Sequence, residues 1–253
     1  MDLSEKDNLG IEEEMNHWWI KTRFLYLSHF LNSYLDKKKS RVIEFGCGSG
    51  QNLIFIRKNL HWPLKISDLV GFDPQMTNDY KHVVLKELEK SDKIYNDLAA
   101  LKLEQSKGEL FDLAISMDVL EHIKDEDAAL QSWRQFLHKD AYLFITVPAF
   151  SFLWSKHYEK LQHFRRYTKD ELIARMEKNN FKTIKIYYIF KHLLPILFIM
   201  RKLFPSLGSN KELQRENPII NTMFTILGYV DFFTRRILPI GGSSVMGIFQ
   251  KRD

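Results

Sequence analysis

Apolar and polar positions follow two different periods along most of the chain. Short, mostly apolar runs have the composition of β-strands, and between several of them apolar side chains recur every three or four positions, which is typical of helices. This alternation predicts an α/β fold with a Rossmann-like, doubly wound sheet of seven strands, mostly parallel, whose last strand is antiparallel. The expected strands lie at residues 41–45, 68–73, 93–98, 111–117, 142–147, 181–189 and 238–252.

Apolar helices are expected near both ends of the chain. Residues 9–36 have the spacing of one or two amphipathic helices, and their His-Trp-Trp cluster at 17–19 would either pack against the main domain or act as a substrate lid. Two further apolar stretches, 193–200 and 217–230, are interpreted as helices inserted before the last strand. They are too short to span a bilayer, which takes about 20 residues.

Glycines occupy every second position directly after the first expected strand. Gly46, Gly48 and Gly50 suit a backbone that turns sharply with positive φ and approaches a ligand closely. A dinucleotide-binding loop would have its third glycine at position 51, which is Gln51, and no Gly-Lys-Ser/Thr sequence marks a phosphate-binding loop. Glu44, just before the turn, would repel a pyrophosphate and favours a ligand with a positive charge. The alternative is a plain turn between a strand and a helix.

Two acids follow the next two expected strands. Asp73 ends the second strand, at the sheet edge where parallel α/β folds bind ligands, and is placed to accept the hydroxyl groups of a ribose. Asp97 follows the third strand and could accept a hydrogen bond from an exocyclic amino group such as that of adenine. The alternative for Asp73 is a solvated side chain at the end of a strand.

Together, the E-x-G-x-G-x-G loop, the two acids and the segment FDLAISMDVLEHI (111–123) resemble the class I S-adenosylmethionine-dependent methyltransferases over about residues 41–148. The resemblance implies that Glu44 and the glycine loop hold the methionine end of S-adenosylmethionine, Asp73 the ribose and residues 97–98 the adenine, with S-adenosylhomocysteine as the product. The candidate cofactor-binding residues are therefore Glu44, Gly46, Cys47, Gly48, Gly50, Asp73, Asp97, Leu98, Ser116 and Met117.

A later segment, residues 154–168, resembles a bacterial, type 11/12-like branch of these enzymes in which a W-S…H-x-R-R-Y-T stretch follows the fifth strand. That branch would have Asp near 158 and Gly near 162, where this chain has Tyr158 and Gln162. The arginine pair could clamp a carboxylate or phosphate of the acceptor. The alternative is a capped helix entrance, because Thr168 and Glu171 have the spacing of a capping box. The candidate substrate-binding residues are Trp154, Arg165, Arg166 and Tyr167.

The net charge of +5 is concentrated in the C-terminal quarter. Residues 181–253 hold 11 Lys and Arg against 4 Asp and Glu, a net charge of +7, which leaves −2 for the first 180 residues. This distribution favours an anionic partner surface. The apolar stretches could lie on an anionic membrane or cover an acyl chain, the alternative being that they pack on the core. Nucleic acid is disfavoured as a partner, because the positive charge is interleaved with long aliphatic runs.

The composition, 45% hydrophobic and 27% charged over 253 residues, is that of a globular protein, interpreted as a single methyltransferase domain. The lone cysteine, Cys47, excludes an internal disulfide, and we recognise no secretory signal, so a cytoplasmic location is expected, peripheral on the inner face of the membrane. We divide the chain into an N-terminal helical cap (1–40), a cofactor-binding core (41–150), a substrate-side insertion (151–180) and the last two strands with inserted apolar helices (181–253).

The predicted activity is methyl transfer to an unidentified acceptor, a lipid-like or anionic small molecule. Alignment of the reactants can supply roughly 7–11 kcal/mol of the barrier, and an oxygen acceptor must also lose a proton. The candidate bases are His122, His163 and Asp118, each of which could instead be a satisfied structural side chain; no metal ligand set is identified. One alternative is a catalytically silent, membrane-associated scaffold. The other is a nicotinamide-dependent oxidoreductase, and Gln51 and Glu44 disfavour this second alternative.

Overall fold

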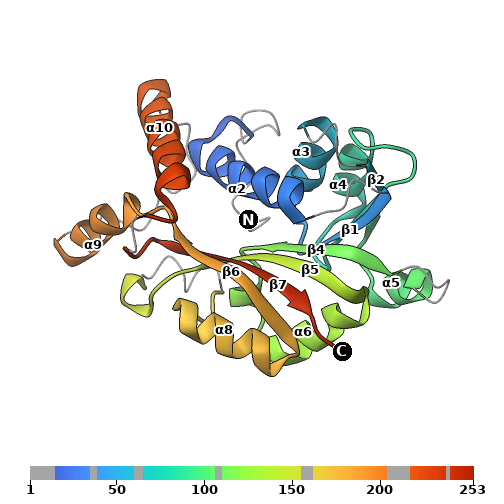
Figure 1. Cartoon of the computed structure of the whole chain (residues 1–253). Coiled ribbons are helices and arrows are strands. Elements are labelled where there is room, and N and C mark those ends of the chain that lie inside the picture. Colours follow the sequence, from blue (N-terminus) through green and yellow to red (C-terminus); the bar gives the residue numbers. More distant parts are fainter. Residues whose placement is uncertain are drawn as a thin grey trace.

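One twisted sheet forms the centre of the protein (Figure 1). The computed structural model describes residues 15–34, 39–59, 65–105, 110–154, 162–203, 217–237 and 240–253. Within them, the strands are β1 (Lys39–Phe45), β2 (Lys65–Phe72), β3 (Lys93–Tyr95), β4 (Phe111–Met117), β5 (Leu137–Pro148), β6 (Phe181–Ile189) and β7 (Ser244–Lys251). Their order is β3-β2-β1-β4-β5-β7-β6, in which the first five strands pair in parallel and β7 runs antiparallel to both neighbours. The predicted fold class, including the antiparallel last strand, is confirmed.

Helices cover both faces of this sheet (Figure 1). They are α2 (Trp18–Tyr34), α3 (Gln51–Asn59), α4 (Asn78–Leu85), α5 (Leu98–Gln105), α6 (Glu126–Gln135), α8 (Lys169–Lys178), α9 (Leu193–Leu203) and α10 (Pro218–Thr234), with short 3₁₀ turns η2 (Leu120–His122) and η3 (Ser151–Leu153). One hydrophobic core lies between the sheet and α2, α3 and α4, and a second lies between the sheet and α5, α6 and α8. Strand β4 and residues 141–148 of β5 are therefore buried on both faces, which explains the nearly unbroken apolar sequences there.

The N-terminal helix is a structural part of the domain. Trp18 is 9% exposed and packs edge-on against Phe190, and its ring lies 5.0 Å from that of Phe224 on α10. The aromatic cluster at 17–19 thus packs against the main domain, which is the first of the two roles considered for it, the other being a substrate lid. Residues 9–14 of the expected helical segment lie outside the described residues.

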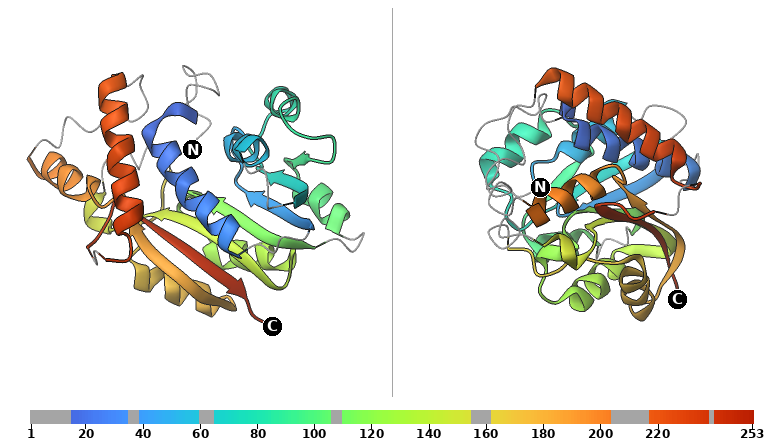
Figure 2. Two further views of the ribbon diagram at one scale, coloured as in Figure 1. Left: turned by 45° about the horizontal axis from the view of Figure 1, so that its top comes forward. Right: turned by 90° about the vertical axis from the view of Figure 1, so that its left-hand side faces the viewer.

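Helix α10 packs across α2 rather than directly on the sheet (Figure 2). The two helices approach closely at Gly228, where a Cβ would stand 2.1 Å from the hydroxyl oxygen of Thr22. Asp231 anchors the helix, because its carboxylate accepts hydrogen bonds from the Tyr26 hydroxyl (3.0 Å) and the backbone N–H groups of Phe190 (2.8 Å) and Lys191 (3.1 Å). The C-terminal helix is therefore tied to both α2 and the end of β6.

Several boundaries differ from the sequence prediction: β1 begins at Lys39 instead of 41, β2 at Lys65 instead of 68, and β7 at Ser244 instead of 238. The third strand ends at Tyr95 instead of 98, because Asp97 starts helix α5, which the sequence analysis did not predict. Strand β5 begins at Leu137, five residues before the expected start, and its first residues are partly exposed. Exposed strand ends lack the apolar pattern by which the other strands were recognised.

Candidate active site

The glycine loop adopts the strained geometry that its sequence predicts. Gly46, Gly48 and Gly50 have φ values of 74°, 51° and 72°, in the left-handed region that favours glycine. A Cβ on Gly46 would stand 2.3 Å from Cγ2 of Val119, and one on Gly50 would stand 2.5 Å from Cγ1 of Val84. The loop is therefore pressed against the turn that follows β4 and against α4, which brings the ends of β1 and β4 together in one site.

Glu44, at the end of β1, is fully buried beside this loop. One carboxyl oxygen accepts a hydrogen bond from the side-chain amide of Asn52 on α3, whereas Oε2 has no hydrogen-bond partner among the described residues. Burial raises the pKa of Glu44 to about 7, although Asn52 and the nearby positive charge of Arg23 oppose the shift. A buried, half-paired carboxylate of this kind would be stabilised by a cationic ligand group.

The two acids at strand ends hold local structure. Asp73 accepts hydrogen bonds from the backbone N–H groups of Gly48 (2.8 Å) and Gln75 (2.9 Å), so it fixes the glycine loop from the end of β2. Asp97 accepts from the N–H groups of Ala99 (3.0 Å) and Ala100 (3.3 Å) and caps α5. Both lie at the C-terminal edge of the sheet, just after the strands that the sequence analysis expected them to follow.

The remaining cofactor candidates differ in exposure. Ser116 and Met117, at the end of β4, are buried, and the Ser116 hydroxyl has no hydrogen-bond partner among the described residues. Leu98 is 37% exposed, which leaves an apolar surface next to Asp97. Cys47 is buried, and its sulfur would lie 2.9 Å from a Cβ on Gly71. The cysteine thus packs between the loop and β2, as its small size suggests.

Arg23 on α2 is a site residue that the sequence analysis missed. It is 4% exposed, and its Nη2 lies 3.2 Å from Oδ2 of Asp118, the residue directly after β4. Asp118 also accepts a hydrogen bond from the Thr146 hydroxyl (3.1 Å) and has a φ of 55°. These contacts disfavour Asp118 as a general base. A basic residue on the otherwise apolar face of a helix was the signal in the sequence, since arginine is seldom buried without a charged partner.

The two candidate histidines lie together. The ring centroids of His122, at the end of η2, and His163, in the loop before α8, are 4.2 Å apart. Glu121 is fully buried beside them, and atoms of the three side chains lie within 4.8 Å of one another. The structure therefore brings two of the three candidate bases together.

The arginine pair at 165 and 166 is engaged in contacts within the protein. Arg165 donates to the carbonyl oxygens of Ile123 (2.7 Å) and Lys124 (2.8 Å), and the buried Arg166 donates to that of Ala149 (2.7 Å). Tyr167 donates to Glu126, and Thr168 with Glu171 forms the capping box of α8. These contacts favour the structural interpretation of this segment. Trp154 is half-buried just after η3, and Tyr158 lies outside the described residues.

The residues present fit S-adenosylmethionine. Its ammonium and sulfonium groups are positive, and the site offers the buried Glu44 with an oxygen that no described residue satisfies, beside a loop shaped by three left-handed glycines. A doubly wound sheet with such a site at the C-terminal ends of its strands defines a class I S-adenosylmethionine-dependent methyltransferase.

Comparisons with known proteins agree. A family model described as "Methyltransferase domain" matches residues 19–186, so the chain belongs to this family. No curated protein matches the sequence.

Several solved structures share the fold at low sequence identity. A SAM-dependent methyltransferase from Archaeoglobus fulgidus is 17% identical with a TM-score of 0.53, over 92% of this chain and 93% of that one. The StiE O-MT structure is 18% identical with a TM-score of 0.51, over 90% and 74% of the two chains. The [4+2]-cyclase SpnF is 13% identical with a TM-score of 0.55, over 91% and 80%. The cyclase shows that the fold also hosts other chemistry, so the acceptor must be inferred from the site.

Proposed function

We propose that the protein transfers the methyl group of S-adenosylmethionine to an amphiphilic acceptor, a lipid-like or anionic small molecule, and that it works at an anionic membrane surface. The observation that carries the acceptor class is a set of exposed aromatic side chains, one of which, Phe164, directly follows His163 in the chain. Phe152, Phe164 and Phe198 are 57%, 50% and 45% exposed. They come from three segments, η3, the loop before α8, and α9.

Two of these aromatic side chains lie close together, and the third lies beside Glu121 and the histidine pair. The Phe152 ring lies 5.9 Å from that of Phe198, and the backbone N–H of Phe164 donates to the carbonyl of Glu121 at 2.8 Å. Exposed apolar side chains, one of them next to polar catalytic candidates, suit an acceptor with a long apolar part and a polar reactive end.

The cofactor half of the site follows from the residues already described. Glu44 and the glycine loop would bind the methionine end, Asp73 the ribose, and Asp97 with Leu98 the adenine. When bound, the cofactor supplies an electrophilic methyl group on a sulfonium. The protein's contribution is to hold the acceptor in line with that group and to exclude water from it, and His122 or His163 would accept the proton of a hydroxyl acceptor.

Labelled S-adenosylmethionine tests this function. We expect methyl transfer into the lipid fraction of a bacterial extract in preference to the water-soluble fraction.

Asp73→Ala should weaken S-adenosylhomocysteine binding by about 1–3 kcal/mol in calorimetry, because it removes the hydrogen-bond acceptor that fixes Gly48. Asp79→Ala, at an exposed position on α4, is the control and should bind as the wild type does. Unchanged affinity in Asp73→Ala would remove this residue from the site, and transfer into neither fraction would favour a silent scaffold.

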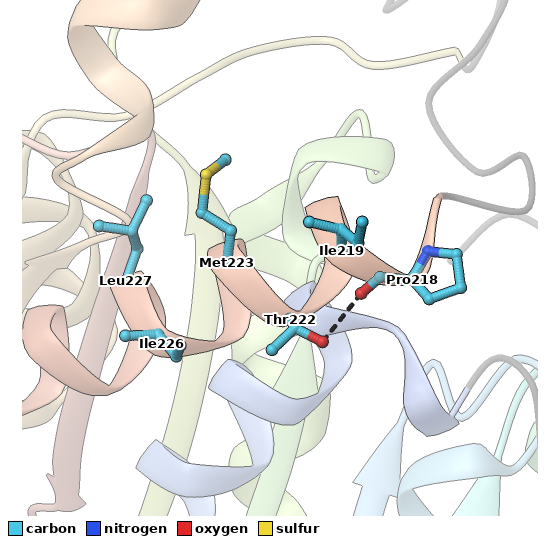
Figure 3. A pocket seen from close by; sticks show the side chains of 6 residues that line it. All are labelled: Pro218, Ile219, Thr222, Met223, Ile226 and Leu227. Carbon is cyan, nitrogen blue, oxygen red and sulfur yellow. Dashed lines mark hydrogen bonds between the residues drawn. The ribbon is translucent and has the colours of Figure 1, made fainter.

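An apolar stripe on α10 supports the membrane proposal. Its outer face carries exposed side chains at intervals of three or four residues, and part of this face lines a hollow of about 540 Å³ (Figure 3). Arg236 is exposed just beyond the helix, and the C-terminal quarter is basic. No helix in the described part of the chain is long and apolar enough to cross a bilayer. The stripe consists of Ile219, Met223, Ile226, Val230 and Phe233, and the exposed Ile237 follows in the turn beyond the helix.

Vesicle sedimentation tests this surface. Phosphatidylglycerol vesicles should recruit the protein at low salt and release it near 1 M salt, where the Debye length falls to about 3 Å, whereas phosphatidylcholine vesicles should bind it weakly. Phe233→Asp should reduce recruitment at least tenfold, because a charge enters the apolar stripe. Leu103→Asp changes an equally exposed leucine on the distant helix α5 and should have no effect. Absence of recruitment at low salt would contradict the membrane proposal.

A further inference from the structure

Three potential metal ligands converge beside the proposed acceptor position. Glu121 and His122 belong to η2, and His163 comes from the loop before α8. Each offers one ligand atom, and these atoms lie within 4.8 Å of one another. The sequence analysis identified no ligand set because the third residue comes from a different segment of the chain.

The backbone around the cluster holds the two segments together. The N–H of Phe164, next to His163, donates to the carbonyl of Glu121 (2.8 Å), and Arg165 donates to the carbonyl oxygens of Ile123 and Lys124. The His122 N–H donates to the carbonyl of Val119 (3.0 Å), which closes η2. Ligands held by such supporting contacts lose little freedom when an ion binds.

The carboxylate of Glu121 points to a missing positive charge. It is 0% exposed, and neither of its oxygens has a hydrogen-bond partner among the described residues. The buried Arg23 is paired with Asp118 and not with Glu121 in the contacts of the described residues. A buried carboxyl group without a partner is costly, and a cation bound to it would remove that cost.

The donor atoms select the kind of ion. Mg²⁺ and Ca²⁺ prefer oxygen ligands, whereas two imidazoles with one carboxylate form a set typical of zinc and related transition metals. Catalytic zinc sites commonly have three protein ligands, His₂Glu among them, and leave a fourth position for water or substrate. Ligand atoms about 2.1 Å from one tetrahedral ion are about 3.4 Å apart, so small side-chain rotations would bring this cluster to the required spacing.

We propose that Glu121, His122 and His163 bind one divalent transition-metal ion of the zinc class. The open fourth position would face the acceptor side of the site and could bind a hydroxyl oxygen of the acceptor. The two histidines would then act as ligands instead of as general bases. Metal binding itself depends on neither the identity of the acceptor nor the methyl donor.

Cobalt titration of the chelator-treated full-length protein tests the site. Co²⁺ should bind with a stoichiometry of one and give a visible d–d absorption band, and Zn²⁺ should abolish the band by displacement. Zn²⁺ should also raise the melting temperature, because it binds the folded state. Glu121→Gln and His163→Ala should each weaken Co²⁺ binding at least tenfold, with circular dichroism confirming that both variants are folded.

His138→Ala is the matched control. His138 is exposed on β5, so this variant should bind Co²⁺ as the wild type does. The proposal is overturned if the wild type gives no band and no rise in melting temperature. It is equally overturned if Glu121→Gln and His163→Ala bind Co²⁺ with the affinity of His138→Ala. Should His163→Ala unfold, Glu121→Gln, which keeps the side-chain shape, decides the question.

Discussion

Replacing Glu44 by glutamine is expected to stabilise the free protein by roughly 3 kcal/mol at about pH 8 and to weaken S-adenosylhomocysteine binding at least tenfold. The stabilisation follows from the burial of Glu44, which raises its pKa from 4.5 to about 7. The weaker binding follows from the loss of a hydrogen bond to a charged ligand group, which is worth about 1.5–3 kcal/mol. A variant that is more stable yet binds less would identify Glu44 as a residue kept for the ligand.

The sign of the pH dependence follows from linkage. Between pH 4.5 and about 7 the folded protein keeps the Glu44 proton while the unfolded chain releases it. The unfolded state therefore binds fewer protons, and the wild-type free energy of unfolding falls as the pH rises through this window. Glutamine does not titrate, so the difference between variant and wild type should be near zero at about pH 4 and should be complete above pH 7. Glu121, whose pKa is also raised, is present in both the wild type and the variant. Its contribution to the free energy of unfolding therefore cancels in the difference between them.

Urea unfolding at several pH values, together with calorimetry of S-adenosylhomocysteine binding, measures both effects. Glu177→Gln is the control, because Glu177 is exposed on α8 and should change neither quantity. A destabilised Glu44→Gln variant, or one that keeps wild-type affinity, would contradict the assignment of Glu44 as the carboxylate that awaits a cation.

Asp231→Ala is expected to lower the free energy of unfolding by about 3–5 kcal/mol. Asp231 is 4% exposed and accepts hydrogen bonds from Tyr26 and from the N–H groups of Phe190 and Lys191. Removal of the carboxylate leaves three buried donors without their acceptor. Burial and the charge of Asp231 raise the pKa of Tyr26, so this hydroxyl remains a donor at any pH used for the experiment.

Tyr26→Phe provides the comparison, since it removes one donor and leaves the other two contacts intact. It should cost about 1 kcal/mol, and the double variant should cost less than the sum of the two single variants, because the residues share one hydrogen bond. Chemical denaturation of the four proteins completes the cycle. A loss below about 1 kcal/mol for Asp231→Ala would mean that α10 is held to the domain chiefly by apolar packing against α2.

The backbone geometry of the glycine loop was predictable from a short sequence pattern, whereas the contacts of the arginine pair at 165 and 166 were not. Glycines at alternate positions after a strand required positive φ, and all three have it. The arginine pair at 165 and 166 carried no such local information. The guanidinium N–H groups can donate equally well to a methyl-acceptor substrate or to backbone carbonyl oxygens. Only the folded chain shows that they donate to the carbonyl oxygens.

The sequence by itself determined the strand and helix periodicity, the glycine turn and the family, because each depends on neighbouring residues or on a local motif. Only the tertiary structure decided that Arg23 pairs with Asp118 and that Asp231 ties α10 to α2. It also decided that the side chain of His163 lies next to those of residues 121 and 122. These contacts join residues far apart in the chain, and their partners are fixed by how helices and loops pack at the ends of the strands. No local pattern of apolar and polar positions contains that information.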